Sequence, residues 1–373
     1  MDRAKREKWL VERLGVGIIG LGEVAQVIHL PILEELSDRY RIAAICDVSP
    51  TLLQSIGDRY GVPKRARHND YGDLVARDDV DAVFVLNSDE YHADCVIAAC
   101  AAGKHALVEK PMCLTSAEAE AIIRARDEAG VRVMVAYMRR FASAFVQAVE
   151  EVKRLERINY VRVRDIIGRN RLIIDQAHTV LRPDDIPAEL AADRAERAKR
   201  LVREAIGEAP PELVRAYRLL CGLSSHDLSA MRELLGFPQG VISATQWNGG
   251  NYLLVVFGYE GYRAILETGV DDQRRFDAHI EVYGPTRSLR IQYDTPYIRH
   301  LPTTLVVQET VGDAFTERVS RPTFKDPYTH ELEAFHEVVT RGATPKTTPE
   351  DFQDDLRLFR MIVDRLREDL ADA

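Results

Sequence analysis

The stretch VGIIGLGEVAQVIHLPIL, from Val16 to Leu33, decides the fold, because its glycines stand where an apolar run ends and a helical pattern begins. The pattern GxGxx(G/A) is met by six consecutive residues, Gly20, Leu21, Gly22, Glu23, Val24 and Ala25. In this pattern the first glycine permits the turn, the second lets a pyrophosphate reach the backbone, and the small third residue lets helix and strand pack closely. The stretch therefore predicts a phosphate-binding loop at a helix N-terminus, with a glycine turn that binds no ligand as the alternative.

Apolar runs of strand length alternate with helical patterns through the first third of the chain. Strands are expected at 15–20, 41–47, 81–87, 105–111 and 131–137, and helices at 23–36, 49–61, 92–103 and 116–130. Pro31 is expected to kink the first helix, and Ser116 is expected to cap the last. This alternation predicts βαβ units and a parallel sheet, so the fold class is α/β with an N-terminal Rossmann domain.

Asp47 closes the second predicted strand, where a carboxylate accepts hydrogen bonds from the adenosine ribose of a bound dinucleotide. The residues that follow it, Val48, Ser49 and Pro50, include no arginine to receive a 2′-phosphate. The sequence therefore favours NAD over NADP, with a solvated Asp47 as the alternative.

Glu109 and Lys110 close the fourth predicted strand and precede a proline, in VEKPMCLT from Val108 to Thr115. The carboxyl end of a parallel sheet is where ligands bind in open α/β folds. A lysine there can donate to a substrate oxygen, and burial readily lowers its pKa. The alternative is an ordinary surface ion pair, which would contribute little.

Composition narrows the function classes. The net charge of −9 provides no basic field for nucleic acid, and no apolar run is long enough to span a bilayer. The five cysteines form no CxxC pair and lie among apolar residues, which favours buried, reduced thiols in a cytoplasmic protein. The first residues lack the features of a secretory signal, and Trp9 and Leu10 suggest a short amphipathic helix. No metal site is expected.

The sequence resembles the glucose–fructose oxidoreductase / inositol 2-dehydrogenase / rhizopine catabolism family, known as Gfo/Idh/MocA. The resemblance lies in the glycine-rich stretch, in the segment from Asp79 to Thr115 that holds the EKP motif, and in VAYMRRF, and it covers about the first 145 residues. It implies a Rossmann domain over residues 1–137 and, over 138–373, an α/β domain with a large, mostly antiparallel open sheet. It also implies oxidation or reduction of sugars and cyclitols with NAD(P).

The resemblance assigns roles residue by residue. Besides the glycine loop and Asp47, it assigns to the cofactor site Asn87, Ser88, His92, Glu109, Lys110 and Arg139. It makes Lys110 the catalytic lysine and brings Arg139 toward the nicotinamide. Met138 departs from the pattern, because the family often has asparagine there.

His226 is the predicted proton-transfer residue, since the family places a catalytic histidine at the start of such a helix. The family's aspartate four residues earlier is replaced by Gly222, and the one three residues later by Ser229. The sequence thus keeps Lys110 and His226 without the usual carboxylate partner. The alternative is a histidine at a helix end with no chemical role.

The C-terminal half holds strand-like runs, then two closing helices, the last with Leu356, Phe359 and Ile362 on a core-facing stripe. The stretch DPYTHELEAF also resembles the family, in which a tyrosine before this helix can reach the active site, so the resemblance makes Tyr328 a candidate substrate residue; a core or surface tyrosine is the alternative. Residues 175–219 form a charged helical insertion relative to the family pattern. It is interpreted as a lid, an oligomer contact or a solvated helical excursion.

Together these features predict an NAD-dependent oxidoreductase acting on a secondary hydroxyl or keto carbon of a sugar, cyclitol or related compound, in a homo-oligomer (dimer or tetramer). Two alternatives stay open. One is a redox-neutral glycosidase, lyase or epimerase with tightly bound NAD. The other is a non-catalytic regulator that binds NAD or a sugar, for which the missing carboxylate is the main indication.

Overall fold

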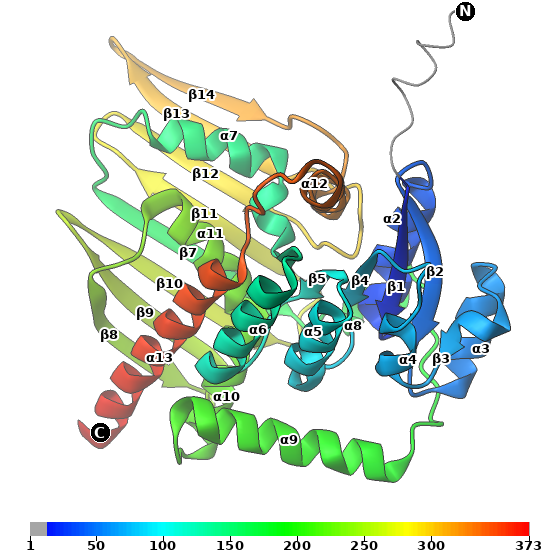
Figure 1. Ribbon diagram of the computed structural model, residues 1–373. Helices are drawn as coiled ribbons and strands as arrows, with labels where there is room; N and C mark the ends of the chain where they lie inside the picture. The colour runs from blue at the N-terminus through cyan, green and yellow to red at the C-terminus, as the bar shows by residue number, and fades with distance from the viewer. Residues whose placement is uncertain (1–12, 373) are drawn as a thin grey trace, which may run out of the picture.

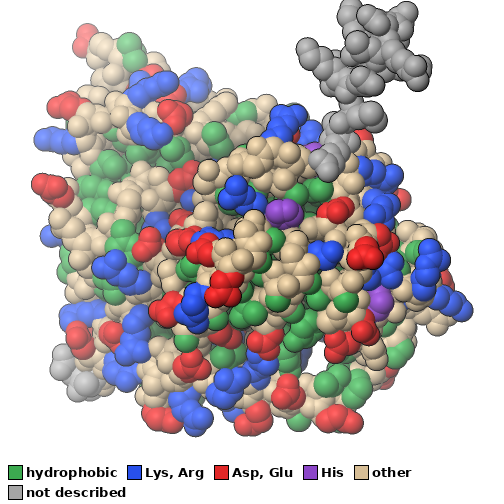
Figure 2. Space-filling model, viewed as in Figure 1, with side chains coloured by type: hydrophobic (Ala, Val, Ile, Leu, Met, Phe, Trp, Pro, Cys, Tyr) green, Lys and Arg blue, Asp and Glu red, His purple; other side chains and the backbone are tan. Residues whose placement is uncertain are grey.

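Two sheets and the helices that cover them make up the computed structural model, which describes residues 13–372 (side chains to 370). The helix expected around Trp9 and Leu10 lies outside the described residues. Figure 1 shows the first sheet at the N-terminal side of the molecule and the second, larger sheet beside it. Acidic and basic side chains are interspersed over the face seen in Figure 2, with no broad field of one sign.

The first sheet is parallel, with strand order β3-β2-β1-β4-β5-β6. This is the order of a Rossmann fold, in which the crevice for a ligand opens between β1 and β4. The strands are β1 (Leu14–Ile19), β2 (Tyr40–Cys46), β3 (Arg67–His68), β4 (Ala82–Val85), β5 (His105–Glu109) and β6 (Val133–Ala136). The helices between them are α2 (Leu30–Glu35), α3 (Pro50–Arg59), α4 (Tyr71–Val75), α5 (His92–Ala101) and α6 (Ser116–Ala129). The predicted parallel sheet is confirmed.

The predicted helix after the glycine loop runs without a break over residues 23–35; its middle is wound as a π-helix, η2 (Ala25–His29), and Pro31 lies in α2 directly after it. One local expectation in this region was wrong. Thr115, not Ser116, caps α6, because its side chain accepts from Glu118 N while Glu118 reaches back to Thr115 N.

The second sheet has the order β14-β13-β12-β11-β7-β10-β9-β8, and only β7 and β10 pair in parallel. The predicted, mostly antiparallel sheet is therefore confirmed. Its strands are β7 (Tyr160–Gly168), β8 (Gly240–Trp247), β9 (Tyr252–Tyr259), β10 (Tyr262–Asp271), β11 (Phe276–Tyr283), β12 (Arg287–Tyr293), β13 (Thr304–Val311) and β14 (Ala314–Ser320).

Helices cover one face of this sheet. Figure 1 shows them as α7 (Ser143–Val152), α11 (Ser225–Leu235) and α13 (Pro349–Asp372), while α12 (Pro327–Arg341) packs against the turn η5 (Met138–Phe141) between the sheets. The predicted apolar stripe of α13 is buried at Leu356, Phe359 and Ile362. The core is thus continuous from the first sheet to the second.

Residues 171–224 connect β7 to α11 by way of α8 (Arg171–Ala177), an extended stretch, α9 (Ala188–Ile206), α10 (Pro211–Leu219) and the π-helix η6 (Leu220–Ser224). Figure 1 shows α9 running along the first sheet's helices, from the neighbourhood of α3 to α10. Its C-terminal half buries Leu201, Val202 and Ile206, so the segment packs on the molecule at that end.

The five cysteines are all free and buried, as expected. Within residues 13–372, no helix has the length and apolar character needed to cross a membrane.

Candidate active site

The glycine loop lies where β1 and β4 diverge. Gly20 has a φ of +93°, and a Cβ at this position would lie 2.5 Å from Asn87 N, so only glycine lets the two strand ends approach this closely. A Cβ on Gly22 would meet nothing within 4 Å, so the backbone there is open to a ligand. Ala25 is fully buried beneath the loop. The first-turn N–H groups at Glu23 and Val24 have no partner within the helix.

Asp47 lies directly beside this loop. Its Oδ2 accepts from Leu21 N at 2.7 Å and its Oδ1 accepts from Ser49 N at 2.8 Å, so backbone groups fix the carboxylate at the edge of the crevice. Burial raises the pKa of Asp47; the two backbone bonds oppose that rise, and the nearby Asp185 adds to it. Each carboxylate oxygen keeps a lone pair for a further donor.

The loop after β4 brings Asn87 and Ser88 to the other side of the crevice, and His92 follows at the start of α5. Asn87 Oδ1 is buried and has no hydrogen-bond partner among the described residues. His92 Nδ1 lies 2.8 Å from Pro111 O and Nε2 lies 3.0 Å from Asn87 O, so the imidazole braces this loop against the EKP turn. Both ring nitrogens of His92 thus contact backbone carbonyls. The carbon atoms of the ring are left to line the cavity.

Lys110 follows the end of β5, and its bond to Pro111 is cis. Its Nζ donates to Gly222 O at 2.6 Å. Burial lowers the pKa of Lys110, Glu109 opposes this and Arg139 adds to it. Glu109 is turned away from the lysine tip toward His29, with Oε1 2.9 Å from His29 Nε2. Burial alone would raise the pKa of Glu109, but His29 and Lys110 lower it below its usual value.

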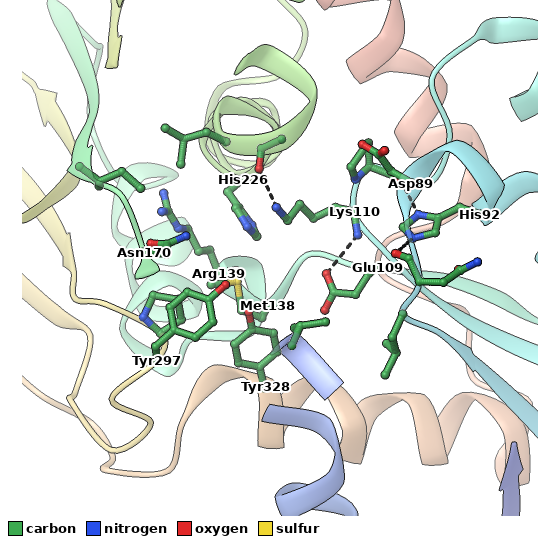
Figure 3. Close-up of a pocket in the computed structure, with 18 of the residues that line it drawn as sticks. Asp89, His92, Glu109, Lys110, Met138, Arg139, Asn170, His226, Tyr297 and Tyr328 are labelled. Carbon is green, nitrogen blue, oxygen red and sulfur yellow. Dashed lines mark hydrogen bonds between the residues drawn. The ribbon is translucent and has the colours of Figure 1, made fainter. Parts of the chain in front are cut away.

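His226 stands one residue into α11, directly after the π-helix that holds Gly222. Figure 3 shows His226 and Lys110 directed toward one another across the pocket. Burial, with the charges of Lys110 and Arg139, holds the pKa of His226 well below its usual value. Its Nδ1 is buried without a partner among the described residues. The carboxylate missing at Gly222 is thus replaced by a backbone carbonyl, which binds the lysine and not the histidine.

Arg139 is not free to reach a ligand through its guanidinium ends. Nη1 donates to Asp227 Oδ1 at 2.5 Å and Nη2 donates to Asp165 Oδ2 at 3.1 Å, and the group also lies over the ring of Tyr293, 5.1 Å from its centroid. Burial raises the pKa of Asp227 well above its usual value, and Arg139 opposes that rise. Arg139 therefore links η5, which carries it, to β7 and α11 beside Lys110 and His226.

Lys110, His226 and their neighbours line an open cavity of about 300 Å³. Eight of the predicted residues line it, namely Val24, Asn87, His92, Glu109, Lys110, Arg139, His226 and Tyr328. The rest of the predicted set, which is Gly20, Leu21, Gly22, Glu23, Ala25, Asp47 and Ser88, does not line this cavity and lies at the ends of β1, β2 and β4.

Sequence reasoning missed several lining residues, including Asp89, Asn170, Phe276 and Tyr297, which reach the cavity from four separate elements or loops. Figure 3 shows Tyr297 and Tyr328 together on the side opposite Lys110. Burial raises the pKa of Tyr328 well above its usual value, so its hydroxyl stays protonated at neutral pH. The described part of the chain has no group of three or more His, Cys, Asp or Glu side chains that could hold a metal ion.

The donor set fits a dinucleotide. The open side of Gly22 and the first-turn N–H groups suit a pyrophosphate, and the spare lone pairs of Asp47 suit ribose hydroxyls. The unpartnered Asn87 Oδ1 leaves an acceptor at the same crevice.

Residues 14–137 match the GFO_IDH_MocA family, described as an oxidoreductase family with an NAD-binding Rossmann fold. The match covers the N-terminal, Rossmann part of the chain. The resemblance to Gfo/Idh/MocA oxidoreductases is therefore confirmed.

Relatives of known activity share this domain. An inositol 2-dehydrogenase of Salmonella typhimurium is 34% identical over 135 residues, which cover 36% of this chain and only 40% of that enzyme. A myo-inositol 2-dehydrogenase of Thermotoga maritima is 28% identical over 346 residues, covering 90% of this chain and 91% of that enzyme. The aldose-aldose oxidoreductase of Caulobacter crescentus, crystallised with glycerol, superposes with a TM-score of 0.73 at 22% identity, over 96% of this chain and 98% of that structure. This last likeness shows that the two-sheet fold is shared.

Proposed function

We propose that this Gfo/Idh/MocA protein is an NAD-dependent oxidoreductase acting on a secondary hydroxyl or keto carbon of a cyclitol, a sugar or a sugar-derived compound. The observation that carries the proposal is the shared cavity: Lys110 and His226 meet at the carboxyl end of the Rossmann sheet, beside an open glycine loop. The inositol dehydrogenases of Salmonella and Thermotoga support the substrate class.

The residues that would hold the cofactor follow from the fit described above. The loop Gly20–Ala25 would bind the pyrophosphate, and Asp47 would bind the adenosine ribose. Asn87 and Ser88 would form the opposite wall of the crevice. The nicotinamide, when bound, supplies the acceptor or donor for a hydride at the substrate carbon. Asp47 and the absence of arginine at positions 48–50 support NAD over NADP.

Lys110 would bind the substrate oxygen. Its ammonium already donates to a carbonyl, Gly222 O, at 2.6 Å, so a substrate oxygen would replace that acceptor or accept from another N–H of the same ammonium. A cation at this point stabilises negative charge that develops on the oxygen as the carbon is oxidised. The lowered pKa of Lys110 makes it a better proton donor than an ordinary lysine.

His226 would accept the hydroxyl proton. Its lowered pKa keeps the imidazole neutral at physiological pH, which is the form that can accept a proton. A protonated His226 would stand beside Lys110 and Arg139, so the proton would leave readily once the product departs. Tyr328 and Tyr297, on the other side of the cavity, would present hydroxyl groups to a polyol.

The test is a panel of cyclitols, aldoses and sugar acids incubated with NAD and followed at the NADH absorbance band. We expect stoichiometric NADH with at least one polyol. Product formed without net NADH would favour a redox-neutral enzyme, and ligand binding with no turnover across the panel would favour a regulator.

A further inference from the structure

An extended stretch, residues 178–187, crosses the Rossmann domain beside the proposed cofactor crevice; we call it the strap. Leu181 N donates to Gln26 Oε1 at 2.9 Å, and Gln26 Nε2 donates to Leu181 O at 3.0 Å, which ties the strap to the helix that follows the glycine loop. Arg182 Nη2 donates to Glu23 Oε2 at 2.6 Å. The strap is thus attached where a pyrophosphate would bind.

Its next contact lies at the end of β2. Ser49 Oγ donates to Asp185 Oδ1 at 2.6 Å, and Thr51 N donates to Asp185 Oδ2 at 2.9 Å. Ser49 is also the residue whose N–H donates to Asp47 Oδ1. Asp185 therefore occupies the donors at the start of α3, the nearer of which, Ser49, lies two residues from the carboxylate proposed to bind the adenosine ribose.

We infer that Asp185 is a specificity-determining residue that excludes the 2′-phosphate of NADP. The inference rests on the proposed function, because it assumes that the adenosine ribose binds at Asp47. A 2′-phosphate at that ribose would need cations or unoccupied donors near the end of β2. The hydroxyl and N–H best placed to provide them already bind Asp185, whose negative charge would repel the phosphate.

No positively charged side chain of the strap is free to offset the negative charge of Asp185. The strap's one arginine, Arg182, is bound to Glu23 at 2.6 Å and to Asp175 at 3.0 Å. The donors that hold Asp185 also lower its pKa, so it is ionised at neutral pH. Discrimination against NADP thus comes from two carboxylates, Asp47 on the Rossmann domain and Asp185 on a segment that the family pattern does not predict.

The far end of the strap is fixed as well. Two residues of α9 make these contacts: Asp193 Oδ2 accepts from Tyr91 Oη at 2.5 Å, and Arg197 Nε donates to Glu90 O at 2.6 Å. These bonds hold the helix that follows the strap against the loop after β4. Asp185 is therefore held in place from both sides, by Gln26 before it and by α9 after it.

The experiment is calorimetric titration of NAD and NADP into the full chain and into Asp185→Asn, with Asp184→Asn as the matched control. Asp184 is exposed and adjacent to Asp185. Because both substitutions replace aspartate by asparagine, they change the net charge equally. We expect Asp185→Asn to tighten NADP binding about tenfold, since it removes a negative charge that would stand beside the 2′-phosphate. NAD binding should change less than threefold, and Asp184→Asn should leave the NAD/NADP ratio within twofold. A further variant, Asp185→Ser, should act in the same direction.

An unchanged ratio in both Asp185 variants, or an equal change in Asp184→Asn, would overturn the inference while leaving the proposed function intact. A full chain that binds neither nucleotide would contradict the proposed function itself. Repeating the NADP titrations at high salt adds a check, because screening should reduce the difference between Asp185→Asn and the unaltered chain.

Discussion

Arg139 offers the sharpest test of how the site is built, because the structure assigns its guanidinium to two buried carboxylates. Replacing it in Arg139→Met keeps most of the aliphatic stem but removes the bonds to Asp165 and Asp227. Each charge-assisted bond contributes about 1.5–3 kcal/mol, and removing one partner of a buried ion pair costs about 3–5 kcal/mol. We therefore expect the free energy of unfolding to fall by about 3–5 kcal/mol near pH 7.

The loss should also depend on pH. Asp227 has a raised pKa in the folded chain, and Arg139 is the group that opposes that rise. Without Arg139 the pKa rises further, so the folded state binds a proton that the unfolded chain releases above about pH 4. The stability that a protonated Asp227 contributes to the variant is then fully present below about pH 4 and is lost as pH rises through the folded pKa.

Urea unfolding of Arg139→Met at pH 5 and pH 8 measures both effects, with a larger deficit expected at pH 8. The matched control is Arg124→Met, an exposed arginine whose pair with Glu120 spans 3.9 Å, where we expect a change within about 0.5 kcal/mol. A deficit below about 1 kcal/mol in Arg139→Met, or one independent of pH, would refute the reasoning.

Three further predictions concern the reaction and its loop. Lys110→Ala should lower turnover by about 10²-fold or more with NAD affinity within a few-fold, as steady-state kinetics and calorimetry would show, and near-normal turnover would rule out its role. The acid limb of the pH profile of kcat/KM for oxidation should lie below pH 6.5, because the pKa of His226 is lowered. Position 222 has room for a side chain, so Gly222→Asp should place a carboxylate near His226 and move that limb to higher pH. His226→Ala should abolish most turnover. Gly20→Ala should destabilise the chain and abolish NAD binding. Gly103→Ala, also at positive φ but with no neighbour within 4 Å, should bear only the backbone cost, so equal losses in the two variants would contradict the close approach to Asn87.

Much of the Rossmann domain could be predicted because its signals are local. A glycine pattern between a strand and a helix, an aspartate at the end of the next strand, and a lysine before a proline each lie within a few residues. Their meeting at one edge follows from the rule that parallel strands end on the same side of a sheet.

The ion pairs of Arg139 with Asp165 and Asp227 had a signal in the sequence that the prediction did not use. In β7, Val161, Val163, Asp165 and Ile167 occupy the same, buried side of the strand. An aspartate in that series predicts a buried partner with positive charge, since an unpaired carboxylate there would be costly. The identity of that partner, Arg139, depends on tertiary packing and could not be predicted from spacing.

Other features had no usable signal. The hairpin β13–β14 was not expected, and every residue of β14 from Ala314 to Val319 is exposed, so the strand shows no alternation. The bond from Lys110 to Gly222 O involves a backbone carbonyl in a π-helix, which no side-chain pattern reveals. Asp185 and Ser49 are 136 residues apart, and only the path of the strap brings them together.

The most direct test of the central claim is the fate of a deuterium on the carbinol carbon of whichever panel compound is oxidised. We expect mass spectrometry to find the label in the reduced nicotinamide, and we expect Lys110→Ala to slow its appearance about 10²-fold or more. Label that stays in the product or exchanges with solvent, with the nicotinamide unlabelled, would contradict hydride transfer at this site.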